Sequence, residues 1–252
     1  MAAELSGLCA LVTGGGSGIG LATAAMLADR GARVACLDLR TAAVPAPLIP
    51  VTGDVADDSV ADAVTAAVGR LGGLDVLVNN AGVLARGTVE DTDLAEWRRV
   101  FEINVLGMVR VTRAALPWLR SAAHAAIVNT CSLGALVGLP TAAPYCTSKG
   151  AVYALTLAMA ADHLRDGIRV NCVVPAPVDT PWVRRQVAAA PDPVAGLAAV
   201  SARQPHGRLV TADEVAAAIC YLAGPLAGST TGTSITLDGG SRGVLLPPWM
   251  SL

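Results

Sequence analysis

The feature that most constrains the fold of this chain is a regular alternation of short apolar runs with longer, helix-like segments. Residues 8–13, 33–38, 74–79 and 168–174 are nearly continuous apolar runs, and Ala-rich segments of helical period separate them. Uninterrupted apolar strands are typical of parallel sheets that are covered on both faces. The pattern therefore predicts one α/β domain, with a doubly wound parallel sheet and right-handed crossover connections.

Weaker signals complete the predicted order of elements. Three further apolar runs bring the sheet to seven strands, and the helices cover both of its faces, which is the architecture of the Rossmann fold. These further strands are residues 48–51, 125–131 and 232–237. The first helix follows the glycine cluster and ends near residue 30. The other helices span residues 57–70, 93–119 (one long helix or a pair), 143–165 and 211–223. Thr211 and Glu214 form a capping-box pattern at the last helix.

Two regions depart from this regular pattern. Residues 39–50 contain three prolines and are too short for a full connecting helix, so a turn or a stub is expected there. Residues 175–210 are proline-rich and are expected to be largely irregular. Because no internal repeat or linker is visible, residues 1–252 are predicted to form a single domain.

Composition excludes several classes of protein. Hydrophobic residues make up 53% of the chain and charged residues 15%, which favours a large buried core over disorder. The net charge of −2 and the few aromatic residues argue against a nucleic-acid partner. Three widely separated histidines give no metal-ligand spacing, so no metal is expected.

Location is predicted from the cysteines and from the apolar segments. The six cysteines lack C-x-x-C spacing and are interpreted as free thiols in a reducing, cytoplasmic compartment, and no secretory signal pattern begins the chain. Residues 121–148 carry no charge, which raises the question of a membrane span. Because this stretch contains polar residues and two prolines, a buried strand followed by a loop is expected instead, with no membrane partner.

The glycine cluster after the first strand predicts a phosphate-binding turn. Thr13 is followed by Gly14, Gly15, Gly16, Ser17, Gly18, Ile19 and Gly20, and a helix begins at once. Glycines let the backbone approach a pyrophosphate, and the helix start offers free N–H groups. A flexible glycine-rich turn is the alternative interpretation, but the position between a strand and a helix favours nucleotide binding.

Acidic and amide residues at other strand ends extend this predicted nucleotide site. Asp38 ends the second strand, where its carboxylate can accept hydrogen bonds from the adenosine ribose and would repel a 2′-phosphate. NAD(H) is therefore favoured over NADP(H), although Arg40 could approach a 2′-phosphate. Asp54-Val55 and Asn79-Asn80-Ala81-Gly82 follow the third and fourth strands and are expected at the same edge, with some of the asparagines acting as scaffold.

A predicted catalytic group follows the fifth strand. Tyr145 and Lys149 lie four residues apart at a helix start and so share one face. A nearby ammonium stabilises the phenolate and lowers the pKa of a tyrosine, which suits it to proton transfer. Ser132 could bind the substrate oxygen, and Asn104 is either a satisfied core amide or the anchor of a water that leads to Lys149. Tyr145 and Lys149 alone could equally be an ordinary helix face.

Taken together, these motifs resemble the short-chain dehydrogenase/reductase family over residues 5–240. The motifs are Thr13-Gly14-x-x-x-Gly18-x-Gly20, Asn79-Asn80-Ala81-Gly82, Asn104, Ser132, Tyr145-x-x-x-Lys149 and Leu237-Asp238-Gly239-Gly240. The resemblance implies that Tyr145 is the general acid/base, that Ser132 orients the substrate oxygen, and that Asn104 supports a proton-relay water. It also implies that Lys149 binds the nicotinamide ribose and lowers the pKa of Tyr145.

The resemblance also implies a cofactor site and an assembly. Val178 and Thr180 would meet the nicotinamide carboxamide, although Ala176-Pro177 replaces the glycine that the family usually has. The family is usually tetrameric, and the apolar tail Val244–Trp249 would suit an interface. The expected cofactor-binding residues are Gly14, Ser17, Gly18, Ile19, Gly20, Asp38, Asp54, Val55, Asn80, Ala81, Gly82, Tyr145, Lys149, Val178 and Thr180.

A substrate lid is expected at residues 181–210. It contains four arginines, and arginines suit a carboxylate or a phosphate, although each could equally belong to a solvated helix face. The pattern Arg203-x-x-x-x-Arg208 and the final Ser251-Leu252 resemble the branch that oxidises keto-deoxy sugar acids and small hydroxy acids, but Ala142 stands where that branch often has arginine. The expected substrate contacts are Ser132, Tyr145, Trp182, Arg185 and Arg203.

The leading hypothesis is an NAD(H)-dependent oxidoreductase that interconverts a secondary alcohol and a ketone. One alternative is an NADPH-dependent reductase of a 3-oxoacyl or similar ketone. A second alternative is a non-catalytic, nucleotide-sensing scaffold, against which the complete set of Ser132, Tyr145 and Lys149 argues.

Overall fold

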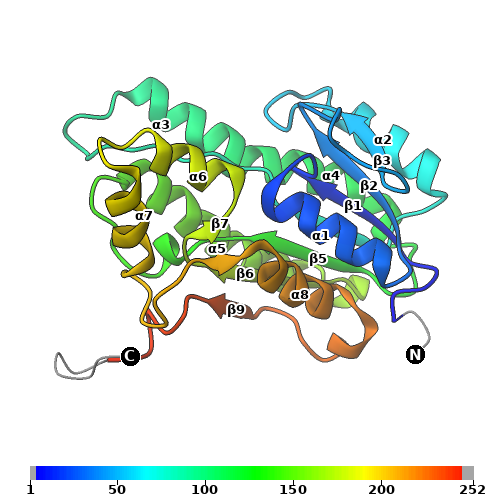
Figure 1. Ribbon diagram of the computed structural model, residues 1–252. Helices are drawn as coiled ribbons and strands as arrows, with labels where there is room; N and C mark the ends of the chain where they lie inside the picture. Colours follow the sequence, from blue (N-terminus) through cyan, green and yellow to red (C-terminus); the bar gives the residue numbers. More distant parts are fainter. Residues whose placement is uncertain (1–3, 246–252) are drawn as a thin grey trace.

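The computed structural model describes residues 4–245 and contains the predicted doubly wound sheet (Figure 1). Seven strands are ordered β3–β2–β1–β4–β5–β6–β9, and every pair of neighbours is parallel. The strands are β1 (Cys9–Thr13), β2 (Arg33–Asp38), β3 (Ile49–Thr52), β4 (Val76–Asn79), β5 (Ala126–Thr130), β6 (Arg169–Pro175) and β9 (Ser234–Leu237).

Helices cover both faces of the sheet, as predicted. The helices α1 (Gly18–Asp29) and α8 (Ala212–Ala223) pack side by side on one face, while α2 (Val60–Leu71), α4 (Gly107–Leu119) and α5 (Ala143–Asp162) cover the other (Figure 1). All five residues of β1 and of β5 are buried, which explains why these strands appear as uninterrupted apolar runs.

The strand order reverses at β1, and this reversal positions the functional site. β1 pairs with β2 on one side and with β4 on the other, so the connections leaving these strands diverge at their carboxyl ends. In open α/β sheets such a switch point leaves a crevice in which ligands bind. The glycine turn after β1 and the Asn-Asn-Ala-Gly segment after β4 both lie at this edge.

The predicted helix at residues 93–119 contains an unexpected turn. It begins with α3 (Leu94–Phe101), passes through a π-helical turn at Glu102–Leu106, and continues as α4 without a break in direction. Such π-helical turns are rare, and many of those that occur lie at functional sites. Asn104 is in the middle of this turn.

The short connection at residues 39–50 contains no helix, as predicted. Two successive turns close it, through hydrogen bonds from the Val44 N–H to the Thr41 carbonyl and from the Leu48 N–H to the Pro45 carbonyl. The half-buried Val44 packs against the core beneath. The capping box of Thr211 and Glu214 at α8 is also present.

The expectation of a largely irregular segment at residues 175–210 is wrong. This segment holds two short paired strands, β7 (Val178–Asp179) and β8 (Val210–Thr211), and two helices, α6 (Pro181–Ala188) and α7 (Pro193–Ser201). Thr180 and Asp192 accept hydrogen bonds from the first N–H groups of these helices, and a proline follows each of them. Here the prolines begin helices rather than interrupt them, because the first helical position needs no N–H donor.

The uncharged stretch at residues 121–148 divides into β5, a short turn and the start of α5. Within residues 4–245, no helix is long and apolar enough to cross a membrane. All six cysteines are free, as predicted. From position 246 on, the tail Val244–Trp249 that was expected at an interface lies outside the described residues, and so do the final Ser251-Leu252.

Candidate active site

The turn between β1 and α1 has the geometry that the glycines predict. Gly14 and Gly18 have φ angles of 64° and 54°, a conformation that residues with a side chain disfavour. A Cβ at Gly20 would overlap the carbonyl group of Gly14, so the helix can start this close to the turn only with glycine. Ser17 precedes α1 without capping it, and the first helical turn carries no acidic residue. The start of α1 can therefore accept an anionic group.

Asp38 at the end of β2 is fixed against this turn. One carboxylate oxygen accepts the Gly16 N–H at 3.0 Å, and the other accepts the backbone N–H of Arg40 at 3.0 Å. Each oxygen keeps a lone pair that can accept a hydrogen bond from a hydroxyl group. Arg40 is exposed, and its backbone rather than its guanidinium contacts Asp38.

The segment after β4 is tied to the end of β1. The Thr13 hydroxyl accepts the backbone N–H groups of Asn80 at 3.0 Å and Ala81 at 3.1 Å, and the Asn80 side chain donates to the Thr13 carbonyl at 3.1 Å. The buried Asn79 side chain instead donates to Asn129 on β5 at 3.0 Å. Asn79 is therefore scaffold, whereas Asn80 and Ala81 hold the loop at the crevice.

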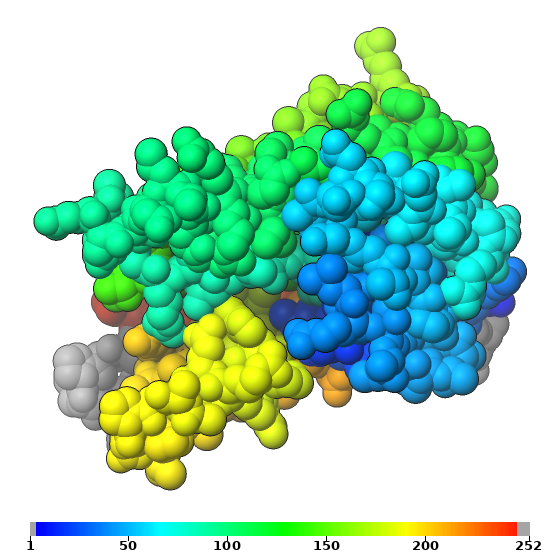
Figure 2. Space-filling model, turned by 90° about the horizontal axis from the view of Figure 1, so that it is seen from above, coloured from blue at the N-terminus to red at the C-terminus, as the bar shows by residue number. Residues whose placement is uncertain are grey.

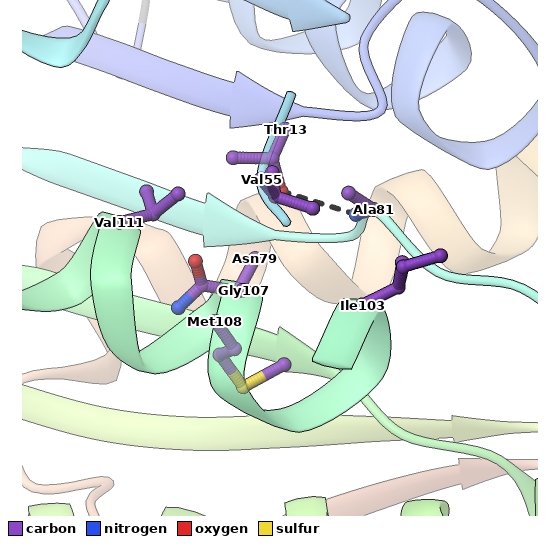
Figure 3. A pocket seen from close by; sticks show the side chains of 8 residues that line it. All are labelled: Thr13, Val55, Asn79, Ala81, Ile103, Gly107, Met108 and Val111. Atoms are coloured by element: carbon purple, nitrogen blue, oxygen red, sulfur yellow. Dashed lines mark hydrogen bonds between the residues drawn. The ribbon is translucent and has the colours of Figure 1, made fainter. Parts of the chain in front are cut away.

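Val55 forms part of the wall beneath this loop. Figure 3 shows a narrow gap that is lined by Val55, Ala81, Gly107 and neighbouring residues. The hydrogen bond between Thr13 and Ala81 is drawn in the same view. A Cβ at Gly107 would lie 2.9 Å from a Val55 methyl carbon, so glycine lets α4 approach this closely. The neighbouring Asp54 accepts the Ala56 N–H at 2.9 Å and so fixes the turn that carries Val55.

Asn104 joins three parts of the site. Its side chain is fully buried; the Oδ1 atom accepts the Val83 N–H at 2.8 Å, and the Nδ2 group donates to the Val83 carbonyl at 2.9 Å and to the Ser148 hydroxyl at 3.0 Å. Both amide protons are therefore used within the protein. One lone pair of Oδ1 remains as an acceptor for another group.

Lys149 is buried directly beside this amide. Its ammonium group donates to the carbonyl of Thr130 at the end of β5, at 2.8 Å, and burial lowers its pKa. A Cβ at Gly82 would lie 3.5 Å from the Lys149 nitrogen and 3.1 Å from Oδ1 of Asn104. The missing side chain of Gly82 therefore leaves space next to both groups.

Ser132 follows β5 and Tyr145 begins α5, and both lie around Gly134: the Ser132 hydroxyl accepts the Gly134 N–H at 3.2 Å, and a Cβ at Gly134 would lie 3.5 Å from a Tyr145 ring carbon. Burial raises the pKa of Tyr145 to about 12, and the Ser132 hydroxyl partly opposes this shift. The sequence predicts that Lys149 lowers this pKa, but in the structure the loss of water around the phenol outweighs any such effect. The Lys149 ammonium is directed to the Thr130 carbonyl instead.

The lid begins beside the glycine turn. The Thr180 side chain caps α6, and a Cβ at Gly18 would lie 3.3 Å from its methyl carbon. Val178 is buried in β7 and pairs with Val210. The unusual Ala176-Pro177 leaves this backbone paired, because the Pro177 carbonyl accepts the Val210 N–H at 3.1 Å.

The structure separates the arginines of the lid into two kinds. Arg184 forms a two-point ion pair with Asp179, and Arg208 forms one with Glu214, so both are engaged within the protein. Trp182 and Arg185 are exposed, three residues apart on α6, and so share one face of that helix. Arg203 lies after α7, where its carbonyl accepts the Ser241 hydroxyl, and it is not brought together with them.

An apolar hollow of about 550 Å³ lies between α6 and α7. Its lining residues are Asp179, Val183, Arg184, Val187, Ala188, Pro193, Val194, Leu197 and Leu209. Ser132, Tyr145 and Lys149 do not line it, so this hollow is separate from the predicted reacting groups.

Sequence reasoning missed two features of the site. Ser148 links Asn104 to α5, and Arg86 in the segment after β4 contacts Gln186 of the lid at 3.0 Å. The position of Ser148 beside Lys149 could have indicated the first. No local pattern indicates the second contact, because it joins residues 100 positions apart.

Comparison with known proteins identifies the family. A family model described as enoyl-(acyl carrier protein) reductase matches residues 14–242. The chain belongs to the short-chain dehydrogenase/reductase family. It is therefore an oxidoreductase that acts on CH–OH groups or the corresponding carbonyls, and dehydrogenases of this family use NAD(H) or NADP(H).

Two curated relatives and one solved structure span almost the whole chain. The cis-4-hydroxycyclohexanecarboxylate dehydrogenase of Sinomonas cyclohexanicum is 40% identical over 93% of this chain and 96% of its own length. The 2-keto-3-deoxy-L-fuconate dehydrogenase of Xanthomonas campestris pv. campestris is 36% identical over 94% of this chain and 81% of its own length. The ligand-free aldohexose dehydrogenase of Thermoplasma acidophilum has a TM-score of 0.91 at 30% identity, and covers 98% of this chain and 100% of its own.

Proposed function

We propose that this protein is an NAD(H)-dependent dehydrogenase that interconverts a secondary alcohol and a ketone, with a hydroxy acid or a sugar acid as its substrate. The observation that carries the proposal is the meeting of Ser132, Tyr145, Lys149 and Asn104 at the sheet edge that also bears the glycine turn. A scaffold that only senses nucleotides needs no such proton-handling group.

The crevice fits a dinucleotide in three respects. The start of α1 has no capping side chain and can take the pyrophosphate, while Asp38 can accept hydrogen bonds from the adenosine ribose. The Lys149 ammonium uses one of its three protons on Thr130 and keeps two for the nicotinamide ribose. The remaining contacts would come from Gly14, Ser17, Gly18, Ile19, Gly20, Asp54, Val55, Asn80, Ala81, Gly82, Tyr145, Val178 and Thr180. When bound, the nicotinamide supplies or accepts the hydride.

The side chains of the chain itself handle the proton. Ser132 donates a hydrogen bond to the substrate oxygen and holds it next to the Tyr145 phenol. In the direction of reduction Tyr145 gives its proton to the developing alkoxide, and in oxidation the phenolate removes the hydroxyl proton. Lys149 holds the nicotinamide ribose, and Asn104 keeps α5 and the loop after β4 in register through Ser148 and Val83.

The choice of NAD(H) rests on charge at the end of β2. Asp38 is held between Gly16 and the Arg40 backbone, so its carboxylate cannot easily turn away from a 2′-phosphate, which it would repel. The substrate class is supported by the relatives, two of which are named for carboxylate-bearing substrates. Trp182, Arg185 and Arg203 remain the substrate contacts that the sequence predicts.

A second candidate is an NADPH-dependent reductase of a 3-oxoacyl-type ketone. It is favoured by the exposed Arg40 guanidinium next to Asp38 and by the description of the matching family model. We also propose a cytoplasmic homotetramer, supported by the free cysteines and by the family resemblance.

The test is an assay of the purified protein with NAD⁺ and NADP⁺ against secondary alcohols, polyols, hydroxy acids and sugar acids, followed by absorbance of the reduced cofactor. We expect turnover of at least one acid, with NAD⁺ preferred. Tighter binding of NADPH than of NADH would replace the first candidate by the second, and binding of NADH without any turnover would favour a scaffold.

A further inference from the structure

Arg86 is an exposed cation in the segment that follows β4, and within residues 4–245 it forms no ion pair. Its guanidinium donates to the side-chain carbonyl of Gln186 on α6 at 3.0 Å, and the residue is exposed. Among the described residues no carboxylate lies within ion-pair distance of it, in contrast to Arg184 and Arg208. A neutral amide is a weaker acceptor for a guanidinium than a carboxylate is.

The backbone fixes where this cation lies. Gly87 pairs with the residues that lead into α5: its N–H donates to the Thr141 carbonyl at 2.9 Å, and its carbonyl accepts the Ala143 N–H at 3.0 Å. Tyr145 follows two residues after Ala143. Arg86 is therefore held between the start of the catalytic helix and the lid, and Figure 2 shows the lid segment lying against the segment that follows β4.

We propose that Arg86 binds the carboxylate of the substrate and that Gln186 keeps the guanidinium in place until the substrate arrives. The proposal rests on the function proposed above and deepens it, because it assigns the recognition of the acid to a residue outside the lid. A carboxylate can accept two parallel hydrogen bonds from the guanidinium and so replaces the single bond to Gln186. The lid, which carries Gln186, is thereby released from Arg86 and adjusts around the bound acid.

The test compares charged with uncharged substrates. The probes are 3-hydroxybutyrate and 4-hydroxycyclohexanecarboxylate, each with its methyl ester, assayed with NAD⁺. For Arg86→Gln we expect kcat/KM for the acid to fall about 10- to 100-fold, mainly through KM, while kcat/KM for the ester stays unchanged. Arg86→Lys retains the charge but cannot donate two parallel hydrogen bonds, so its kcat/KM for the acid is expected to lie between those of the wild type and Arg86→Gln.

Three further variants separate recognition from structure. Arg165→Gln, the same change at an exposed arginine after α5, is expected to leave both substrates unaffected. Gln186→Ala is expected to retain activity on the acid, because the acid replaces Gln186 in the bound state. If Gln186→Ala loses as much activity as Arg86→Gln, the contact is structural and the proposal is overturned.

The remaining outcomes are equally decisive. An acid-specific loss in Arg185→Gln and not in Arg86→Gln would assign the carboxylate to the lid. Equal losses for acid and ester in Arg86→Gln, or no loss for either, would also overturn the proposal while leaving the dehydrogenase function intact. If the wild type turns over none of the acids of the screen described above, and neither of the two esters, with either cofactor, the proposed function itself fails.

Discussion

The sheet edge and the lid hold their functional side chains in different ways. At the edge, Asn104 and Lys149 are buried, and each is bound to a backbone group of a neighbouring segment, Val83 or Thr130. In the lid, Trp182 and Arg185 are exposed, and the ion pairs that Arg184 and Arg208 form join surface side chains.

This difference separates two kinds of change. A backbone carbonyl persists whatever residue carries it, and a backbone N–H group is lost only to proline, so these backbone partners of Asn104 and Lys149 persist through most substitutions. A contact between two exposed side chains is lost when either one changes. Under the proposed function, the reacting groups are therefore fixed to the sheet, whereas the expected substrate contacts of the lid are exposed residues that can be exchanged one at a time.

The largest effect that tests this difference between the sheet edge and the lid is expected at Tyr145. Tyr145→Phe removes the proton donor and leaves the ring, so kcat is expected to fall by a factor of about 10² to 10⁴. NADH affinity, measured by fluorescence titration, is expected to stay close to that of the wild type. Unchanged turnover would mean that the proton is handled elsewhere.

Ser132→Ala tests the roles proposed for Ser132 and Tyr145 through the pH dependence of the reaction. Loss of a donor to the substrate oxygen is expected to lower kcat by a factor of about 10² to 10³. Because the Ser132 hydroxyl lowers the raised pKa of Tyr145, its removal raises that pKa further. Oxidation requires the phenolate, so the pH at half-maximal oxidation should move upward. A shift to lower pH would contradict the arrangement.

Asp38→Asn tests the nucleotide end of the edge. The amide keeps one acceptor oxygen but removes the charge, so the ratio of kcat/KM for NAD⁺ to that for NADP⁺ should fall about 10- to 100-fold. Steady-state kinetics with both cofactors measure this ratio. The electrostatic argument is wrong if the ratio does not change.

Gly82→Ala places a methyl group next to Asn104 and Lys149. We expect kcat to fall about 10-fold, because the Asn104 amide oxygen, at 3.1 Å from the added Cβ, must move by a few tenths of an ångström. The matched control is Gly69→Ala on α2, where a Cβ meets nothing within 4 Å. Similar kinetics for the two variants would show that the space at Gly82 is not used.

The smallest effect is expected at the lid pair Arg208–Glu214. Glu214→Gln keeps the capping box but removes the ion pair, and because both side chains are exposed it should cost less than about 1 kcal/mol in the free energy of unfolding. Arg208 first, and the Thr211 N–H and hydroxyl groups after it, lower the pKa of Glu214 from 4.5 to about 2, so the stabilisation is present above pH 4.5 and is lost as the pH falls toward 2. Urea titrations of both proteins at several pH values measure this difference, and activity should not change.

Features written in short, local patterns were predictable. Residues 33–38 were expected as a strand and form β2 with the same bounds, and the glycine turn and the capping box are as expected. These features depend on apolar runs, on backbone freedom and on caps, which neighbouring residues determine. The helices α6 and α7 were missed although Thr180-Pro181 and Asp192-Pro193 are start signals, because the density of prolines was taken for irregularity.

Features that depend on distant residues were not predictable. The Lys149 ammonium binds a carbonyl on β5, and Arg86 meets Gln186 across 100 positions; neither contact follows from spacing. The raised pKa of Tyr145 results from burial, which the arrangement of several elements determines together. The sequence predicts which residues react, but it cannot predict the burial that sets their proton affinity.

The π-helical turn at Glu102–Leu106 makes the position of the Asn104 side chain depend on the number of residues in this turn. An α-helix rotates by about 100° per residue, so deleting one residue from this turn could restore an ordinary helix and leave α4 in its place on the sheet. The fold would survive, yet Asn104 would no longer bridge Val83 and Ser148. Deletions are usually tolerated in loops rather than in helices. Here, a deletion in the middle of a helix could leave folding unchanged and still displace a side chain of the candidate active site.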